Sequence, residues 1–177
     1  MEKEKKGLVL VFTGNGKGKT TAALGLALRA IGHEFHVFMV QFKKSNSNVG
    51  EFKAINQYLP HFTIVQSGIN KMSAGGYLED DEAVIVQNGF LQGKKALQSG
   101  DYDLVIFDEI NIVMDHGQLS IQEVLEMLAS RPPHVDVVLT GRNAPSEIIN
   151  YADLVSEVKE IKHHFKSGVK ARKGVEF

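Results

Sequence analysis

The sequence predicts an α/β fold in which helices cover both faces of a mostly parallel sheet. Short apolar runs alternate along the chain with longer helical patterns, and this alternation favours parallel strands joined by helical crossovers. The first apolar run leads through a glycine-rich loop into a helical pattern. The polar residues of chemical interest follow predicted strands, at the edge where such sheets bind ligands. We therefore expect a P-loop NTPase-like (RecA-like) fold.

The predicted strands are short and rich in apolar residues. Residues 8–12 are apolar at every position, which is typical of a strand buried on both faces. Further strands are predicted at residues 36–42, 62–66, 104–107 and 135–140, with a last one at 154–161. The pattern leaves the order of these strands in the sheet open.

The predicted helices carry recognisable start and stop signals. Residues 20–31 are rich in alanine and leucine and end at Gly32, a typical C-cap residue. Residues 79–99 carry acidic side chains in the first turn, where the helix dipole favours them. Ser120 and Glu123 form a capping box ahead of another helix. That helix stops before Pro132, and shorter helices are predicted at residues 50–58 and 145–151.

Length and composition indicate one ordinary globular domain. The 177 residues, 43% hydrophobic and 23% charged, suggest a single P-loop domain over residues 1–177, with 1–6 as a flexible, solvated tail. A net charge of -1 gives no electrostatic reason to expect nucleic acid or an anionic membrane as a partner.

The residue types that are absent narrow the chemistry. The chain has no cysteine, which excludes disulfides, thiolate metal sites and cysteine nucleophiles and fits a reducing cytoplasm, where we expect the protein. No apolar run approaches the roughly 18 residues of a membrane-spanning helix. The N-terminus also lacks the layout of a signal peptide.

The stretch TGNGKGKTT, from Thr13 to Thr21, predicts a phosphate-binding loop. Gly18, Lys19 and Thr20 supply the second half of the pattern G-x-x-x-x-G-K-[ST], but the first glycine is Gly14, one residue late. Glycines allow backbone N–H groups to face an anion, and the start of the next helix adds positive charge. We expect Lys19 to reach phosphate oxygens and Thr20 to bind Mg²⁺. A glycine-rich turn without a ligand is the alternative, but it would not explain why the lysine and threonine coincide with it.

A second motif follows the strand at residues 104–107. Asp108 and Glu109 stand at its tip, where a carboxylate can hold Mg²⁺ directly or through water. Glu109 can instead act as a base that activates water. A helix-capping aspartate beside a solvated glutamate is the structural alternative. With the phosphate loop upstream, the pair predicts a nucleoside triphosphate bound with Mg²⁺ at Thr20, Asp108 and Glu109.

Other residues near these motifs are weaker candidates. Asn15 is expected to bond phosphate or ribose, or else to serve only as a turn residue. Lys17 is either a charge near phosphate or a solvated one. Arg142 follows a strand and Gly141 at the ligand edge. The residues that these motifs predict to bind nucleotide are Gly14, Asn15, Gly16, Lys17, Gly18, Lys19, Thr20, Thr21 and Arg142.

The chain resembles the ATP:corrinoid adenosyltransferases of the CobA/BtuR (CobO) type. The resemblance rests on FTGNGKGKTTAA from Phe12, VQF from Val40, FDE from Phe107, LTGR from Leu139 and ADLVSEV from Ala152. It closes with IKHHFKSGVKARKGVEF from Ile161, which is similar to the ending of that family. The loop variant and the ending are the most specific pieces, because generic P-loop proteins share neither.

The resemblance implies a cob(I)yrinic acid a,c-diamide or cob(I)alamin adenosyltransferase. The Co(I) of a reduced corrinoid, cobalamin or a precursor such as cobinamide, attacks the 5′ carbon of ATP, and triphosphate leaves. The implied catalytic residues are Lys19, Thr20 and Glu109, with Mg²⁺ or Mn²⁺ neutralising charge on the leaving group. The resemblance also implies a homodimer and an electron-donor flavoprotein or reductase as partner.

The family resemblance further implies an unusual orientation of ATP. Members bind it in the reversed sense along the loop, so that the 5′ carbon rather than the γ-phosphate meets the nucleophile. Our hypothesis is that the displaced Gly14 reshapes the loop to allow this. The resemblance places Arg29 near the nucleotide, and a surface arginine is the alternative. The position of Arg142 at the ligand edge predicts a contact with the phosphates or the corrinoid.

The sequence departs from the family where the corrinoid would bind. Many members carry a G-F-x-W pattern after the third strand, but here Ile69 replaces the phenylalanine and Lys71 replaces the tryptophan. Ile69 can still form an apolar platform, the stem of Lys71 is apolar, and Met72 is a possible substitute. The polar stretch 44–50 gives no functional signal. This departure leaves the corrinoid contacts open.

Two other functions therefore remain possible at this stage. The chain could be a P-loop ATPase or phosphotransferase that uses Glu109, or a non-catalytic ATP-binding regulatory paralogue. The histidines favour neither, since no H-E-x-x-H is present. His163 and His164, if they lie on a strand, face opposite sides and cannot share a metal.

Overall fold

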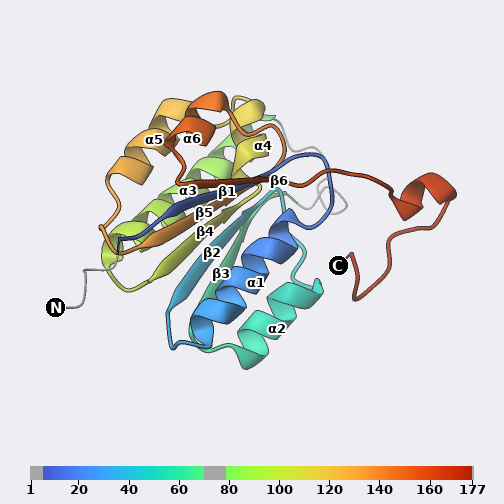
Figure 1. Cartoon of the computed structure of the whole chain (residues 1–177), viewed down its shortest axis with the longest axis horizontal. Helices are drawn as coiled ribbons and strands as arrows, with labels where there is room; N and C mark the ends of the chain where they lie inside the picture. The colour runs from blue at the N-terminus through green and yellow to red at the C-terminus, as the bar shows by residue number, and fades with distance from the viewer. Residues whose placement is uncertain (1–5, 70–78, 177) are drawn as a thin grey trace.

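Six parallel strands form the centre of the fold (Figure 1). The structure is a computed structural model and describes residues 6–69 and 79–176. The strand order is β3-β2-β4-β5-β1-β6, and each neighbouring pair runs parallel. The predicted parallel sheet is therefore confirmed, and its order places β5 between the strand before the phosphate loop and the strand that ends in Asp108.

The strand positions agree with the sequence prediction to within one residue at most ends. They are β1 (Val9–Thr13), β2 (Val37–Phe42), β3 (Phe62–Ser67), β4 (Leu104–Asp108), β5 (Asp136–Thr140) and β6 (Leu154–Glu157). The prediction was wrong for the last strand, which ends four residues before Ile161. Among the described strands it pairs only with β1, which gives way to the phosphate loop after Thr13, so the strand pairing ends there.

The helices also follow their predicted positions. They are α1 (Lys19–Ile31), α2 (Gly50–Tyr58), α3 (Glu79–Ser99), α4 (Ile110–Asp115), α5 (Ile121–Ala129) and α6 (Ser146–Tyr151). The capping box of α5 is confirmed, since Ser120 Oγ accepts from Glu123 N–H at 3.1 Å and Glu123 Oε2 accepts from Ser120 N–H at 3.1 Å. The short α4 was not predicted.

The sheet is covered on both faces, as expected (Figure 1). Helices α1 and α2 lie on one face, and α3, α4, α5 and α6 lie on the other. Neighbouring residues of one strand therefore enter different cores: Met39 packs on the α1 side, and Val40 packs on the α3 side. This explains why β2 and β4 are buried at every position and why their sequences are apolar almost throughout.

The segment after β6 leaves the sheet and returns to it (Figure 1). It contains a short 3₁₀ helix, η1 (His164–Ser167), and comes back toward the start of α1. The adjacent histidines do not lie on a strand, so the argument from opposite strand faces does not apply to them, and their rings stack with centroids 4.6 Å apart. Within the described part of the chain, no cluster of three or more His, Cys, Asp or Glu residues could hold a metal ion. Nor is any described helix long and apolar enough to cross a membrane.

Candidate active site

The phosphate loop between β1 and α1 is shaped by its contact with the chain after β6. Gly14 and Gly18 have φ angles of 95° and 120°, which L side chains rarely adopt. Gly16 N–H donates to Val158 O at 2.7 Å. A Cβ on Gly14 would lie 2.5 Å from Val158 O, and one on Gly16 would lie 2.8 Å from the same atom. Both positions thus require glycine, and Gly14 is the residue that opens the loop.

Lys19 lies inside the loop that precedes it. Its side chain is almost fully buried, and its ammonium donates to Gly14 O at 2.7 Å and to Gly16 O at 2.8 Å. Burial lowers the pKa of Lys19, and the negative charge of Glu109 opposes that shift. The ammonium therefore lies where incoming phosphate oxygens can replace the loop carbonyls as its partners.

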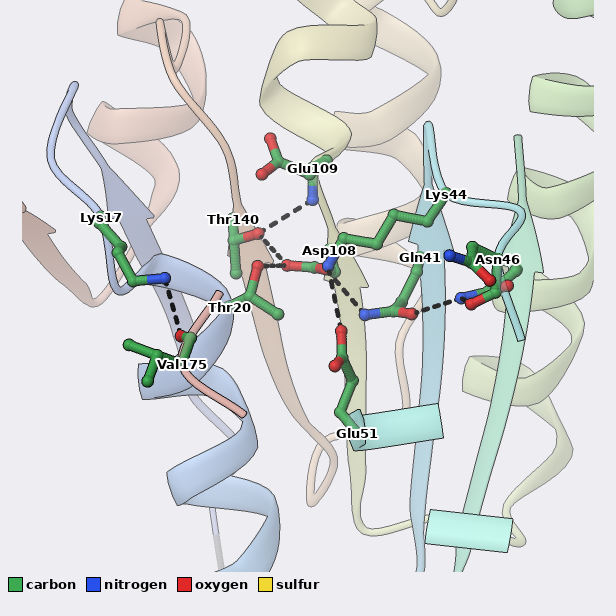
Figure 2. A network of polar contacts seen from close by, with 11 residues as sticks. Lys17, Thr20, Gln41, Lys44, Asn46, Glu51, Asp108, Glu109, Thr140 and Val175 are labelled. Atoms are coloured by element: carbon green, nitrogen blue, oxygen red, sulfur yellow. Dashed lines mark hydrogen bonds and ion pairs between the residues drawn. The ribbon is translucent and has the colours of Figure 1, made fainter. Parts of the chain in front are cut away.

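Asp108 is the polar centre of the site (Figure 2). It ends β4, is fully buried, and accepts hydrogen bonds from side chains on both sides of the strand. Thr20 Oγ1 and Thr140 Oγ1 donate to Oδ1 at 2.8 and 2.6 Å. Lys44 Nζ and Gln41 Nε2 donate to Oδ2 at 3.0 and 3.3 Å. These donors fix the carboxylate beside the hydroxyl of Thr20 at the start of α1.

Glu109 faces a different direction from Asp108 (Figure 2). It adopts a left-handed backbone, with φ at 66°, and its N–H donates to Thr140 Oγ1 at 2.9 Å. Such backbone strain in a non-glycine residue is often found at functional sites. Oε2 of Glu109 is buried without a hydrogen-bond partner among the described residues.

The surroundings of Glu109 favour its neutral form. Burial raises the pKa of this carboxyl, and the nearby charge of Asp108 raises it further. The positive charges of Lys44, Lys19 and Arg142 partly offset the shift. The carboxyl group of Glu109 thus lies near three positively charged side chains, and it is directed away from Asp108 and Thr20 (Figure 2).

We expect Glu109→Gln to change the pH dependence of stability. The folded protein holds this proton more tightly than the unfolded chain, so ionisation destabilises the wild type as pH rises above the ordinary value of 4.5. The glutamine variant lacks this loss. Urea unfolding between pH 4.5 and 8 should show the variant gaining stability relative to wild type with rising pH. A difference that stays constant over this range would contradict the raised pKa.

A cavity of about 560 Å³ opens in front of these residues, within the size range of small-molecule sites. The phosphate loop and the start of α1 form one wall, through residues 16–21 and Leu24. Lys44, Gly50 and Glu51, from β2's end to the start of α2, form another. Glu109 and Arg142 follow β4 and β5, and His163 with residues 174–176 closes the remaining side. The cavity thus lies at the carboxyl edge of the sheet.

The C-terminal residues contact the phosphate loop directly. Lys17 Nζ donates to Val175 O at 3.0 Å (Figure 2). It also lies 3.9 Å from Oε1 of Glu176. The same oxygen lies 3.3 Å from His164 Nε2. The hydrogen bond that the backbone N–H of Arg172 donates to Glu176 is the main cause of the lowered pKa of this carboxyl. The end of the chain therefore forms part of this site.

Comparison with known proteins identifies the family. The sequence model of the family described as ATP:corrinoid adenosyltransferase BtuR/CobO/CobP matches residues 5–177. The chain belongs to this adenosyltransferase family. The corrinoid adenosyltransferase CobA of Salmonella typhimurium is 36% identical over 174 residues, covering 98% of this chain and 87% of that protein. The corrinoid adenosyltransferase of Pseudomonas aeruginosa is 36% identical over 179 residues, covering 99% and 86%.

A more distant solved structure shares the fold alone. The flagellar accessory protein FlaH of Methanocaldococcus jannaschii superposes with a TM-score of 0.56 at 14% sequence identity. The match covers 86% of this chain and 71% of that one. The P-loop type of α/β sheet predicted from the sequence is therefore confirmed for this adenosyltransferase family member.

The structure brings most of the predicted site residues of this adenosyltransferase together. Those that line the cavity are Gly16, Lys17, Gly18, Lys19, Thr20, Thr21, Glu109 and Arg142. Gly14 contributes through its carbonyl, which accepts from Lys19. Asp108 lies behind Thr20, and Asn15 is exposed outside the cavity lining. Glu109 makes no hydrogen bond to Thr20 or Asp108 in the described part of the chain.

Arg29 does not reach the cavity within this chain. It follows Lys19 by ten residues in α1, a distance of roughly 15 Å along the axis. There it borders a separate, largely apolar hollow of about 240 Å³, together with Leu104 and Asp136 at the starts of β4 and β5. This is the opposite edge of the sheet, so the helix itself carries Arg29 away from the phosphate loop.

The expected corrinoid contacts are only partly described. Ile69 is half-buried just beyond β3, while Lys71 and Met72 lie outside the described residues. Three partners of Asp108 were not predicted from the sequence, namely Gln41, Lys44 and Thr140. Each is a polar residue at or just after the carboxyl end of an apolar strand, and that position was the available signal.

Proposed function

We propose that the protein transfers the 5′-deoxyadenosyl group of ATP to the Co(I) of a reduced corrinoid and releases triphosphate. Family membership across nearly the whole chain supports the reaction. The observation that carries the proposal in the structure is the cavity in which the phosphate loop, Lys19 and Arg142 converge. The side chains of Lys19 and Arg142, together with the N–H groups of the loop, suit a highly charged leaving group.

The reaction makes limited chemical demands on the protein. A cobalt–carbon bond forms while the bond between C5′ and the triphosphate oxygen breaks, and the electron pair for the new bond comes from Co(I). The leaving triphosphate takes the electrons of the broken bond. The protein must hold C5′ in line with cobalt and stabilise the charge on the departing oxygen.

Lys19 and the start of α1 would stabilise this leaving group. In the proposed complex the Lys19 ammonium exchanges the carbonyls of Gly14 and Gly16 for phosphate oxygens, at little cost because it is already in place. Arg142 would add a second positive charge from the opposite wall. Glu109, with its unpartnered oxygen, would orient water or a hydroxyl of the substrate.

The residues also fit a divalent cation, Mg²⁺ or Mn²⁺. The Thr20 hydroxyl and the Asp108 carboxylate lie 2.8 Å apart, and Mg²⁺ prefers such oxygen ligands together with phosphate oxygens and water. When bound, the ion would neutralise charge on the triphosphate. Thr20 and Asp108 would hold it, and Glu109 would have to change direction to join them.

Several finer points stay predictions. ATP is proposed to bind in the reversed sense along the loop, and our hypothesis is that the displaced Gly14 allows this orientation. The homodimer and the electron-donor flavoprotein or reductase follow from the family resemblance, and the cytoplasmic location follows from the absence of cysteine.

The products made from ATP test the proposed function. The protein is incubated with ATP, Mg²⁺ and chemically reduced cobalamin or cobinamide, and absorbance follows the cobalt–carbon product. One inorganic triphosphate is expected for each adenosylcorrinoid, and omission of the reductant should prevent both. Formation of ADP and phosphate would instead assign an ATPase or phosphotransferase. Bound ATP with no product would indicate a non-catalytic nucleotide-binding protein.

A further inference from the structure

A second lysine lies close to the phosphate-binding wall (Figure 2). Lys44 follows β2 by two residues, and its side chain runs back over the sheet edge to Asp108. Its Nζ lies 3.0 Å from Asp108 Oδ2 and 3.7 Å from Glu51 Oε1. The same side chain lines the cavity that contains Lys19 and Thr20.

The backbone around Lys44 is held firmly. Lys43 N–H donates to Ser67 O at 3.1 Å, which ties this turn to the end of β3. A Cβ on Gly68 would lie 2.5 Å from Lys44 N, so only glycine permits this approach. Lys43 itself points elsewhere, since its ammonium binds Glu82 at 2.8 Å and also Gln118. Of the two adjacent lysines, only Lys44 is directed into the cavity.

The ammonium of Lys44 has donors to spare. It carries three N–H groups, and among the described residues its one hydrogen bond goes to Asp108, since the distance to Glu51 is too long for another. Its side chain is 28% exposed, on the cavity side. A long, flexible lysine stem also lets the charge move by several ångströms while the backbone stays fixed.

The position of Lys44 relative to Thr20 identifies the ligand class. Thr20 donates to one oxygen of Asp108, and Lys44 donates to the other. The carboxylate of Asp108 therefore lies between the ammonium of Lys44 and the start of α1, where phosphates would bind. An entering triphosphate brings negative charge beside Asp108 and Glu51, and a mobile cation at this point can neutralise it.

We propose that Lys44 binds the triphosphate of the nucleotide, on the side of the cavity formed by α2. In the free protein its ammonium neutralises Asp108 and Glu51, and on binding it turns to the phosphate oxygens. Lys19 and Lys44 thus hold the triphosphate from two walls. The role deepens the proposed function, because it concerns the same ATP site, but it does not depend on adenosyl transfer.

Calorimetric binding of inorganic triphosphate and of ATP tests this role. Lys44→Ala is expected to weaken both by roughly 10- to 100-fold, as for loss of one charge-assisted hydrogen bond, and Lys44→Arg should recover most of the affinity. Lys53→Ala is the matched control, because Lys53 is exposed on α2, carries the same charge and lies outside the cavity lining. It should change either affinity by less than about twofold.

Two results would contradict the proposed role of Lys44. If Lys44→Ala lowers the melting temperature of the free protein but leaves triphosphate affinity unchanged, Lys44 only neutralises Asp108 and the proposal is wrong. Equal losses of triphosphate affinity in Lys44→Ala and Lys53→Ala would also overturn it, since they would reflect only the change in the net charge of the protein. Lys44→Met, which keeps the apolar stem, replaces the alanine variant if that one does not fold. A wild-type protein that binds triphosphate but makes no adenosylcorrinoid contradicts the proposed function and leaves this test intact.

Discussion

Replacing Lys19 by alanine is expected to abolish productive ATP binding and to lower adenosyl transfer by at least about 100-fold. Lys19 is the buried cation of the phosphate loop, and its ammonium binds the carbonyls of both Gly14 and Gly16. Its loss removes a charge that would face the leaving group. It also leaves these two carbonyls without the donor that draws the loop together.

Calorimetry with ATP and the initial rate of transfer measure the effect of Lys19→Ala. Lys19→Met serves as a second variant, because it keeps the apolar length of the side chain without the charge. Both should bind ATP weakly while their far-ultraviolet circular dichroism matches wild type. If either variant binds ATP within about threefold of wild type, Lys19 is not the principal phosphate cation.

Replacing Asp108 by asparagine is expected to remove the dependence of ATP binding on Mg²⁺ and to lower transfer by about 100-fold or more. Thr20 and Thr140 can still donate to the remaining oxygen. The new amide nitrogen, however, faces two donors, Gln41 and Lys44. We therefore expect a loss of about 1–3 kcal/mol in the free energy of unfolding, because those donors no longer have an acceptor.

Titrations of ATP at several Mg²⁺ concentrations, with urea unfolding in parallel, measure both effects of Asp108→Asn. Without Mg²⁺ the variant should bind ATP at least as tightly as wild type, because a negative charge near the phosphates has gone. Asp101→Asn is the control, since Asp101 is exposed in the turn before β4. A Mg²⁺ dependence equal to that of wild type would show that Asp108 holds no metal.

The architecture and the phosphate loop were predictable because their signals are local. The alternation of apolar strands with helical patterns, the capping box at Ser120 and the glycine–lysine–threonine run depend on neighbours within a few residues. Such features are set by backbone sterics and by hydrogen bonds between adjacent residues. The structure changed only their ends, as at β6, which stops when its neighbour β1 does.

The full environment of Asp108 was not predictable, because it depends on strand order. Gln41 pairs with Asp108 across β2 and β4, and Thr140 approaches from β5 on the other side. The sequence leaves that order open, since each apolar strand is compatible with several neighbours. Lys44, in a polar stretch without a functional pattern, reaches Asp108 only because of this arrangement.

The sequence by itself determined the class of sheet, the phosphate loop with its first glycine at position 14, and the paired carboxylates after β4. The tertiary structure alone decided that Arg29 lies at the opposite edge of the sheet, that Lys44 joins the site, and that the chain end returns to Lys17. The physical reason is the separation along the sequence of the residues involved. Local patterns fix each element, whereas contacts between residues far apart in the sequence form only once the elements are packed.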